Sequence, residues 1–252
     1  MTEHVLRAAA GSVTGERYPA NFDVVHLDED PLLAVLADGM GDGEGSRVAG
    51  RTAVEVFVDR IRPVGEAVDP ARLREAVAEA QARVGAAGAR IGDLTGCTLT
   101  ALVASGAGLW LTQIGDSRGY RLRDGLLEQL TTDHTMAWLG AVNGWYAFDS
   151  PETQAARYQL TRYVGHPARP EPDVLNVAPR PGDVLLLCTD GVTDQVPYRR
   201  VREVLAGPGS PADQVARLLA DTEDAGGRDN ATAVVVHVVP ARAATTRTGR
   251  AG

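Results

Sequence analysis

The sequence contains no lysine, so all 25 of its basic residues are arginine, and 33 acidic residues leave a formal net charge of −8 at pH 7. This negative charge argues against a nucleic-acid partner, because binding of nucleic acids depends largely on basic side chains that neutralise phosphates. The chain also has no apolar run near the roughly 18 to 20 residues that span a bilayer, and its N-terminus lacks the basic and apolar segments of a signal peptide. We therefore expect a cytoplasmic protein that binds neither nucleic acid nor membranes.

Cysteine is scarce as well. The chain has two, Cys97 and Cys188, and each lies in an apolar run with strand character. We expect both to be reduced thiols that pack in the core as small apolar side chains, rather than a disulfide. With 44% hydrophobic and 23% charged residues, the composition is that of a soluble globular protein that can bury a core.

Short apolar runs along most of the chain predict strands, and segments of helical spacing lie between them. The runs are residues 5–10, 23–27, 32–37, 98–104, 109–114, 120–123, 126–130, 173–177, 183–188 and 231–239. Two helical segments follow a glycine-rich stretch, and two more lie near 198–206 and from residue 211. Asp124-Gly125 predicts a hairpin between two of the strands, because this dipeptide favours the tight turn.

Capping residues mark the ends of two of these helices. Asp69 followed by Pro70 predicts the start of one helix, and Gly85 and Gly88 mark its fading end. Ser210 is the expected N-cap of the last helix. Strands joined by hairpins, with helices gathered in two pairs, indicate an α+β fold built on antiparallel sheets.

Residues 133–170 show no clean periodicity, although they contain Trp138 and Trp145. We expect an irregular, partly mobile insert there. The small and polar residues 241–252 are expected to form a disordered tail. No linker separates two blocks of different composition, so we expect a single domain over residues 1–240.

Aspartates occur where apolar strands end. Asp38 follows LLAVLA, Asp190 follows VLLLCT, Asp116 follows LTQIG, and Asp229 precedes the last strand. An ionised carboxylate in such a place costs several kcal/mol unless it is paired or binds a metal. Any one of them could be only a turn residue, as Asp124 is. Together, with adjacent glycines that allow close backbone approach, they suit Mg²⁺ or Mn²⁺.

Six segments of the chain, taken together, resemble a known family. In order they are ADGMGDGEGSRVAG (37–50), GCTLTALV (96–103), IGDSRGYRLRDG (114–125), LTTDHT (130–135), GDVLLLCTDGVTD (182–194) and GRDNATAVVV (227–236). They resemble the successive motifs of the PP2C-type (PPM) metal-dependent Ser/Thr protein phosphatases, in the bacterial form. The resemblance implies an α/β/β/α sandwich of two packed antiparallel sheets flanked by helix pairs, in which residues 136–165 take the place of the family's flap.

The resemblance also implies a site with two metal ions, Mn²⁺ or Mg²⁺. By matching position, Asp38 would bridge the two ions and the Gly39 carbonyl would bind one of them, whereas Asp190 and Asp229 would bind the other. The implied reaction is hydrolysis of phosphoserine and phosphothreonine on proteins by a water activated between the ions, without a covalent enzyme intermediate.

Further roles and partners follow from the same resemblance. Asp116 and Asp194 match positions that hold a third, weaker ion, and Asp23 matches the residue that orients water on the metals. The implied partners are phosphorylated Ser/Thr proteins, including a Ser/Thr kinase that the enzyme opposes. We expect a monomer.

Two positions depart from the family's pattern. Phe22 stands where an acidic or amide residue is usual, and Tyr18 stands where a phosphate-binding arginine is usual. Arg17 lies next to Tyr18 and is the candidate to bind phosphate, although a shift of one residue in a strand reverses the side-chain direction. These departures leave open an alternative, a pseudophosphatase that binds phosphoprotein or metal without turnover.

The five residues from Gly115 to Gly119 also fit the nucleophile elbow of α/β-hydrolases, with Ser117 as the nucleophile. That motif requires a strand, a sharp turn and then a helix. Here the chain continues into the predicted hairpin, so an ordinary turn residue is the favoured interpretation of Ser117.

Overall fold

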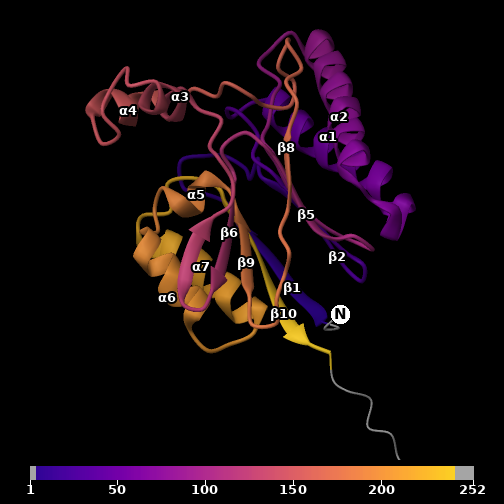
Figure 1. Ribbon diagram of the computed structural model, residues 1–252. Helices are drawn as coiled ribbons and strands as arrows, with labels where there is room; N and C mark the ends of the chain where they lie inside the picture. Colours follow the sequence, from indigo (N-terminus) through magenta and orange to yellow (C-terminus); the bar gives the residue numbers. More distant parts are fainter. Residues whose placement is uncertain (1–3, 242–252) are drawn as a thin grey trace, which may run out of the picture.

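Two five-stranded antiparallel sheets lie at the centre of the protein in the computed structural model, which describes residues 4–241 (Figure 1). The first sheet has the order β1-β10-β9-β6-β7, with the bounds His4–Val13, Ala231–Pro240, Val184–Cys188, Arg118–Arg123 and Leu126–Gln129. The second has the order β2-β3-β4-β5-β8, with the bounds Val24–Glu29, Leu32–Ala37, Leu99–Ser105, Gly108–Ile114 and Asp173–Asn176.

Helices cover the outer face of each sheet (Figure 1). The second sheet is covered by α1 (Glu44–Ile61) and α2 (Pro70–Ile91), which the short 3₁₀ helix η1 (Arg62–Ala67) connects. The first sheet is covered by α6 (Tyr198–Ala206) and α7 (Pro211–Asp224). At one end of the sheets lie α3 (Met136–Val142), α4 (Pro151–Ala156) and α5 (Asp190–Thr193).

Strand β3 shows why a fully apolar run forms a strand here. All of its residues are buried, because both of its faces are covered. Leu33 and Val35 pack toward α1 and α2, whereas Leu32 and Leu36 pack in a second cluster with residues of β9 and β10. A third cluster joins the first sheet to α6 and α7. These three apolar layers confirm the predicted α/β/β/α sandwich.

Both cysteines belong to this core. Cys97 packs in the cluster under α1 and α2, and Cys188 packs in the cluster under α6 and α7. Both are free and fully buried. The prediction of two reduced core thiols is confirmed.

Helix α2 begins as predicted but ends later. The side chain of Asp69 accepts a hydrogen bond from the backbone N–H of Arg72 at 2.8 Å. We expected the helix to end near Gly85 and Gly88. It continues instead to Ile91 and is ended by Gly92, whose φ is 74°. A Cβ at Gly88 would lie 3.0 Å from a threonine side chain in the following loop, so this glycine serves close packing and does not stop the helix.

Turn and cap signals are confirmed at two other places. Asp124 and Gly125 both have positive φ, 51° and 79°, as the tight hairpin between β6 and β7 requires. Ser210 caps α7, and Asp213 completes a capping box with it.

The insert at residues 136–165 is less irregular than expected, because it contains α3 and α4. Thr135 caps α3 by accepting a hydrogen bond from the N–H of Trp138 at 3.2 Å. Ser150 caps α4 by accepting one from the N–H of Thr153 at 3.3 Å. Helices of 7 and 6 residues are too short to show a periodic apolar pattern, which explains why the sequence did not reveal them.

Two other expectations concern membrane-spanning segments and the C-terminal tail. Between residues 4 and 241, no helix is both long enough and apolar enough to cross a membrane. The predicted disordered tail at 241–252 lies outside the described residues, except for residue 241.

Candidate functional site

The four strand-end aspartates come together at one end of the two sheets. Asp38 follows β3 and Asp116 lies between β5 and β6, whereas Asp190 begins α5 just after β9 and Asp229 lies just before β10. All four line one cavity of about 270 Å³. Because both sheets contribute to this cavity, the packing of the sandwich brings together carboxylates that are far apart in the sequence.

Two hydrogen bonds to Thr98 hold the backbone of Asp38 in place at the end of β3. Its N–H donates to the Thr98 hydroxyl at 2.9 Å, and the N–H of Thr98 donates to its carbonyl at 2.8 Å. The Thr98 hydroxyl also lies 2.8 Å from that of Ser117, which is fully buried. Ser117 therefore supports the end of β3 from behind and is not available to attack a substrate.

Gly39 lines the cavity beside Asp38. A Cβ at this position would collide with the side chain of Ser46 and lie 2.8 Å from its carbonyl oxygen. Only glycine lets the backbone pass so close to α1. The position of Gly39 fits the predicted role of its carbonyl as a metal ligand.

Negative charge is concentrated in this cavity. Burial, together with the charges of Asp23 and Asp190, raises the pKa of Asp38 well above its usual range. Burial, followed by the charges of Asp194 and Asp229, raises the pKa of Asp190 to about 6. The ionised carboxylates therefore destabilise one another, and a divalent cation bound among them would relieve that repulsion.

Asp23 is positioned by two threonines. One oxygen, Oδ2, accepts hydrogen bonds from the hydroxyls of Thr189 at 2.9 Å and Thr232 at 2.7 Å. The other, Oδ1, is buried and has no hydrogen-bond partner within residues 4–241. Burial raises the pKa of this carboxyl to about 7. An unpaired buried oxygen fits the predicted role of Asp23, which is to orient a water molecule.

The donors of the cavity fit hard divalent cations, although they do not enclose one by themselves. The described residues that line it supply carboxylates and backbone groups and include no His or Cys, which suits Mg²⁺ and Mn²⁺. Nowhere in residues 4–241 are three His, Cys, Asp or Glu side chains grouped closely enough to hold a metal ion. Mg²⁺ commonly uses one or two carboxylates and keeps several waters. Ions here would therefore complete their coordination with water and the Gly39 carbonyl.

The predicted third-ion site contains an arginine side chain that the sequence did not reveal. Asp116 and Asp194 line a second hollow of about 40 Å³, next to the first. Arg157, which follows α4, forms an ion pair there with Asp194. No spacing rule connects two residues that are 37 positions apart. A third ion stays a prediction, and it would have to displace this guanidinium from Asp194.

A second ion pair lies beside Arg157. Arg118 donates to Asp133 through Nε at 2.9 Å and through Nη2 at 2.6 Å. Both residues belong to segments that resemble the family's motifs, so the sequence marked each of them as a candidate for the site. The sequence did not predict that they pair, because the pairing depends on how the chain passes β6 again after β7.

Tyr18, rather than Arg17, lines the cavity. Arg17 is exposed, and its guanidinium carbon lies 5.8 Å from the centre of the Tyr18 ring. Burial raises the pKa of Asp229, and the nearby charge of Arg17 acts against this rise. Phe22 is buried and packs edge-on against Tyr18, with ring centres 6.0 Å apart. Arg17 thus lies close to the site, and its role in binding phosphate stays a prediction.

A family model described as protein phosphatase 2C matches residues 20–221 of the chain. The chain belongs to the protein phosphatase 2C family. A relative in this family, the serine/threonine protein phosphatase PstP of Mycobacterium tuberculosis, is 35% identical over 240 residues, which cover 93% of this chain and 45% of PstP. The serine/threonine phosphatase Stp of Listeria monocytogenes is 27% identical over 215 residues, 83% of this chain and 85% of Stp. The chain therefore spans about half the length of the PstP relatives and most of the length of Stp.

Solved structures of protein phosphatase 2C relatives have the same fold. The catalytic domain of PstP in complex with two manganese ions has a TM-score of 0.82 and 34% identity, over 94% of this chain and 100% of that one. The PPM Ser-Thr phosphatase MsPP from Mycobacterium smegmatis, in complex with cacodylate, has a TM-score of 0.81 and 32% identity, over 93% of this chain and 99% of that one. The likeness confirms the family and fold expected from the sequence motifs.

Proposed function

We propose that this protein is a metal-dependent phosphatase that hydrolyses phosphoserine and phosphothreonine in proteins with the help of two divalent ions, Mn²⁺ or Mg²⁺. The observation that carries this proposal is the cavity at which aspartates from both sheets meet, where burial and their mutual repulsion raise the pKa of Asp38. Membership of the protein phosphatase 2C family supports it, and the similar catalytic domain of PstP was solved with two manganese ions.

Different residues of the cavity would bind the two ions. Asp38 lies beside both Asp190 and Asp23 and would bridge the ions, and the Gly39 carbonyl would bind one of them. Asp190 and Asp229 would bind the other. Bound there, the ions would supply an acidified water as the nucleophile and neutralise the phosphoryl oxygens.

Asp23 would orient the attacking water. Thr189 and Thr232 hold its carboxylate through Oδ2, which leaves Oδ1 free to accept a hydrogen bond from that water. Phe22 suggested the alternative of binding without turnover. The structure gives that alternative no support at this position, because the two threonines hold Asp23 and the Phe22 ring packs in the protein interior. We therefore propose turnover.

The proposal extends to partners and location. We propose that the substrates are phosphorylated Ser/Thr proteins that include a Ser/Thr kinase, and that the protein acts as a cytoplasmic monomer. A comparison of phosphoproteomes with and without the protein would identify the substrates, and light scattering would give the oligomeric state.

The decisive experiment pairs Asp38→Asn with Asp124→Asn. Both aspartates precede a glycine, but Asp124 lies in the β6–β7 turn, away from the cavity. In the presence of Mn²⁺, we expect the wild type and Asp124→Asn to release phosphate from a phosphothreonine peptide, and Asp38→Asn to release almost none. Calorimetry with Mn²⁺ completes the test. Metal binding without turnover in the wild type would establish the pseudophosphatase instead, and turnover that survives complete chelation would exclude the metal mechanism.

A further inference from the structure

A larger hollow lies near the carboxylate cavity. It is between the insert at 136–165 and the open end of the β6–β7 hairpin, where β6 begins and β7 ends. Its volume is about 590 Å³, and its lining includes Trp138, Phe148, Arg118, Asp133 and Arg157. We call it the insert hollow. It is large enough for a side chain of a bound peptide.

The insert hollow is linked to the carboxylate cavity by shared lining residues. Arg118 and Arg157 line both the insert hollow and the small hollow that contains Asp116 and Asp190. Asp116, Asp190 and Tyr158 in turn line both the small hollow and the carboxylate cavity. The insert hollow therefore adjoins the small hollow, which adjoins the carboxylate cavity, so a residue that flanks the phosphorylated one in a bound peptide would lie near the insert hollow.

The charges of the insert hollow are already paired within the protein. Arg118 forms its ion pair with Asp133, and Arg157 forms its ion pair with Asp194. Each positive charge is balanced by a carboxylate in direct contact. The insert hollow therefore offers no unbalanced charge that would favour a charged side chain of a substrate.

Three of the four threonine hydroxyls that line the insert hollow are likewise engaged in the protein's own structure. The hydroxyls of Thr131, Thr135 and Thr153 form hydrogen bonds with backbone groups at 3.1, 3.2 and 2.6 Å. Thr135 is the cap of α3, and Thr153 belongs to the first turn of α4. These groups shape the insert hollow and leave less polar surface for a ligand.

Apolar surface in the insert hollow comes from two exposed aromatic rings. Trp138 is 40% exposed and Phe148 is 67% exposed, and their ring centres lie 6.1 Å apart at an angle of 90°. Large exposed rings that meet beside a reaction centre are typical of a binding surface. An apolar side chain placed against them would remove apolar surface from water on both sides of the contact.

We propose that the insert hollow binds a large apolar side chain of the substrate, a few residues from the phosphorylated serine or threonine, and that Trp138 and Phe148 form its contact surface. This inference rests on the proposed phosphatase function and adds a preference among phosphoproteins. It makes Trp138 and Phe148 determinants of specificity, because neither lines the carboxylate cavity.

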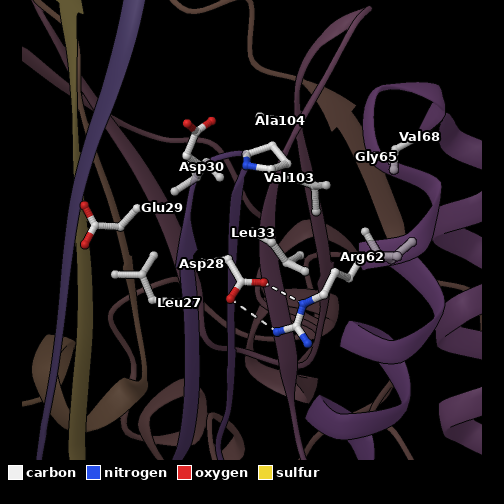
Figure 2. A pocket seen from close by; sticks show the side chains of 13 residues that line it. Leu27, Asp28, Glu29, Asp30, Leu33, Arg62, Gly65, Val68, Val103 and Ala104 are labelled. Carbon is white, nitrogen blue, oxygen red and sulfur yellow. Dashed lines mark hydrogen bonds and ion pairs between the residues drawn. The ribbon is translucent and has the colours of Figure 1, made fainter.

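Another hollow of the protein does not meet the same conditions. It has a volume of about 510 Å³ and lies between the β2–β3 turn and η1, where Arg62 donates to Asp28 at 2.9 Å (Figure 2). Among the described residues, its lining shares none with the carboxylate cavity or with the small hollow. We therefore do not assign it to the substrate chain.

The test measures a ratio of two kcat/KM values for each protein variant. A set of phosphothreonine peptides carries alanine at every flanking position except one, at which leucine is moved from position to position, and an all-alanine peptide is the reference. With Mn²⁺, we expect leucine at one position to raise kcat/KM about tenfold in the wild type. We expect Trp138→Ala and Phe148→Ala to bring this ratio close to one.

Trp145→Ala is the matched control. Trp145 is 58% exposed and belongs to the same insert, but it does not line the insert hollow. We expect this variant to keep the leucine preference. Because each ratio is measured on one preparation, partial misfolding of a variant cancels.

The outcomes separate this inference from the function on which it rests. If wild type hydrolyses every peptide at the same rate, the apolar subsite is wrong and the phosphatase function stands. The subsite is also wrong if the leucine preference persists in both Trp138→Ala and Phe148→Ala. If no peptide is hydrolysed with Mn²⁺, the proposed function fails and this inference fails with it.

Discussion

Strand β9 has an aspartate near each of its ends, and the two carboxyls have opposite environments. Asp183, just before the strand, is buried and accepts hydrogen bonds from Arg123 at 2.7 and 2.8 Å and from the N–H of Arg180 at 2.8 Å. Burial acts to raise the pKa of Asp183, but these hydrogen bonds outweigh it and lower the pKa. At the other end, burial and neighbouring carboxylates raise the pKa of Asp190 to about 6.

This difference separates a structural aspartate from a functional one. Asp183 has an arginine dedicated to it by the neighbouring strand β6, so its charge is satisfied within the fold. Asp190 lies in a cavity lined by further aspartates, and burial, followed by their negative charges, disfavours its ionised form. The fold thus leaves a deficit of positive charge at one end of the sandwich, where divalent cations would bind.

The largest expected effect concerns activity. Asp190→Asn should lower kcat/KM on a phosphopeptide with Mn²⁺ by about 100-fold or more, because metal stabilisation of the transition state is worth several kcal/mol. Asp183→Asn should keep most of the activity of the folded protein, since neither Asp183 nor its partner Arg123 lines the cavity. Initial rates per folded molecule measure both. Equal losses in the two variants would remove the distinction between the two ends of β9.

The next effect concerns stability and has the opposite pattern. Asp183→Ala should lower the free energy of unfolding by about 3 kcal/mol, because it leaves the charge of Arg123 without its buried partner. Asp190→Asn should not destabilise the metal-free protein, since it removes repulsion. Urea unfolding in the presence of a chelator measures both changes. A metal-free Asp190→Asn protein that is as unstable as Asp183→Ala would contradict the comparison.

Metal binding should stabilise only proteins with an intact carboxylate cavity. At a Mn²⁺ concentration about 100 times its Kd, the wild type should gain about 2.7 kcal/mol of stability, and Asp183→Ala should gain a similar amount. Asp190→Asn should gain much less at the same concentration. Thermal unfolding with and without Mn²⁺ provides the measurement. An equal gain in all three proteins would place the ions elsewhere.

The smallest expected effect is a pH dependence at the turn that carries Asp116. His134 is buried, its Nδ1 accepts the N–H of Gly115 at 3.0 Å, and its Nε2 lies 3.1 Å from Asp173. Burial lowers the pKa of His134, against the opposing effect of Asp173, so the folded protein favours the neutral ring. This stabilisation is present above the ordinary pKa of about 6.5 and is lost as the pH falls through the lower folded value.

A variant isolates the contribution of His134. Between about pH 7 and pH 5, the thermal midpoint of the chelated wild type should fall relative to that of His134→Gln, which has no titrating ring. Taking the difference between the two thermal midpoints cancels the contribution of the carboxylate cavity, because both proteins contain it. The raised pKa values of its aspartates act in the opposite direction. A constant difference between the two proteins across this range would show that His134 does not titrate as the structure indicates.

Much of the fold was accessible from local patterns. The apolar runs of β3 and β10 predict strands, because a strand in the middle of a sandwich must be apolar on the faces it buries. Asp69 and Ser210 mark helix starts by a local hydrogen bond that any chain can form. The short helices α3 and α4 were missed, because they depend on caps and tertiary contacts rather than on a periodic pattern.

The site divides in the same way. Aspartates at the ends of apolar strands indicate a cation site from the sequence alone, because burying a carboxylate without a partner is costly. Residue order does not say which aspartate receives an arginine. Arg123 reaches Asp183, and Arg157 reaches Asp194, only after the sheets and the insert have packed. Strand identity and carboxylate chemistry are local properties of the chain. Charge pairing and the position of the insert hollow near the carboxylate cavity depend on distances that only the folded chain sets.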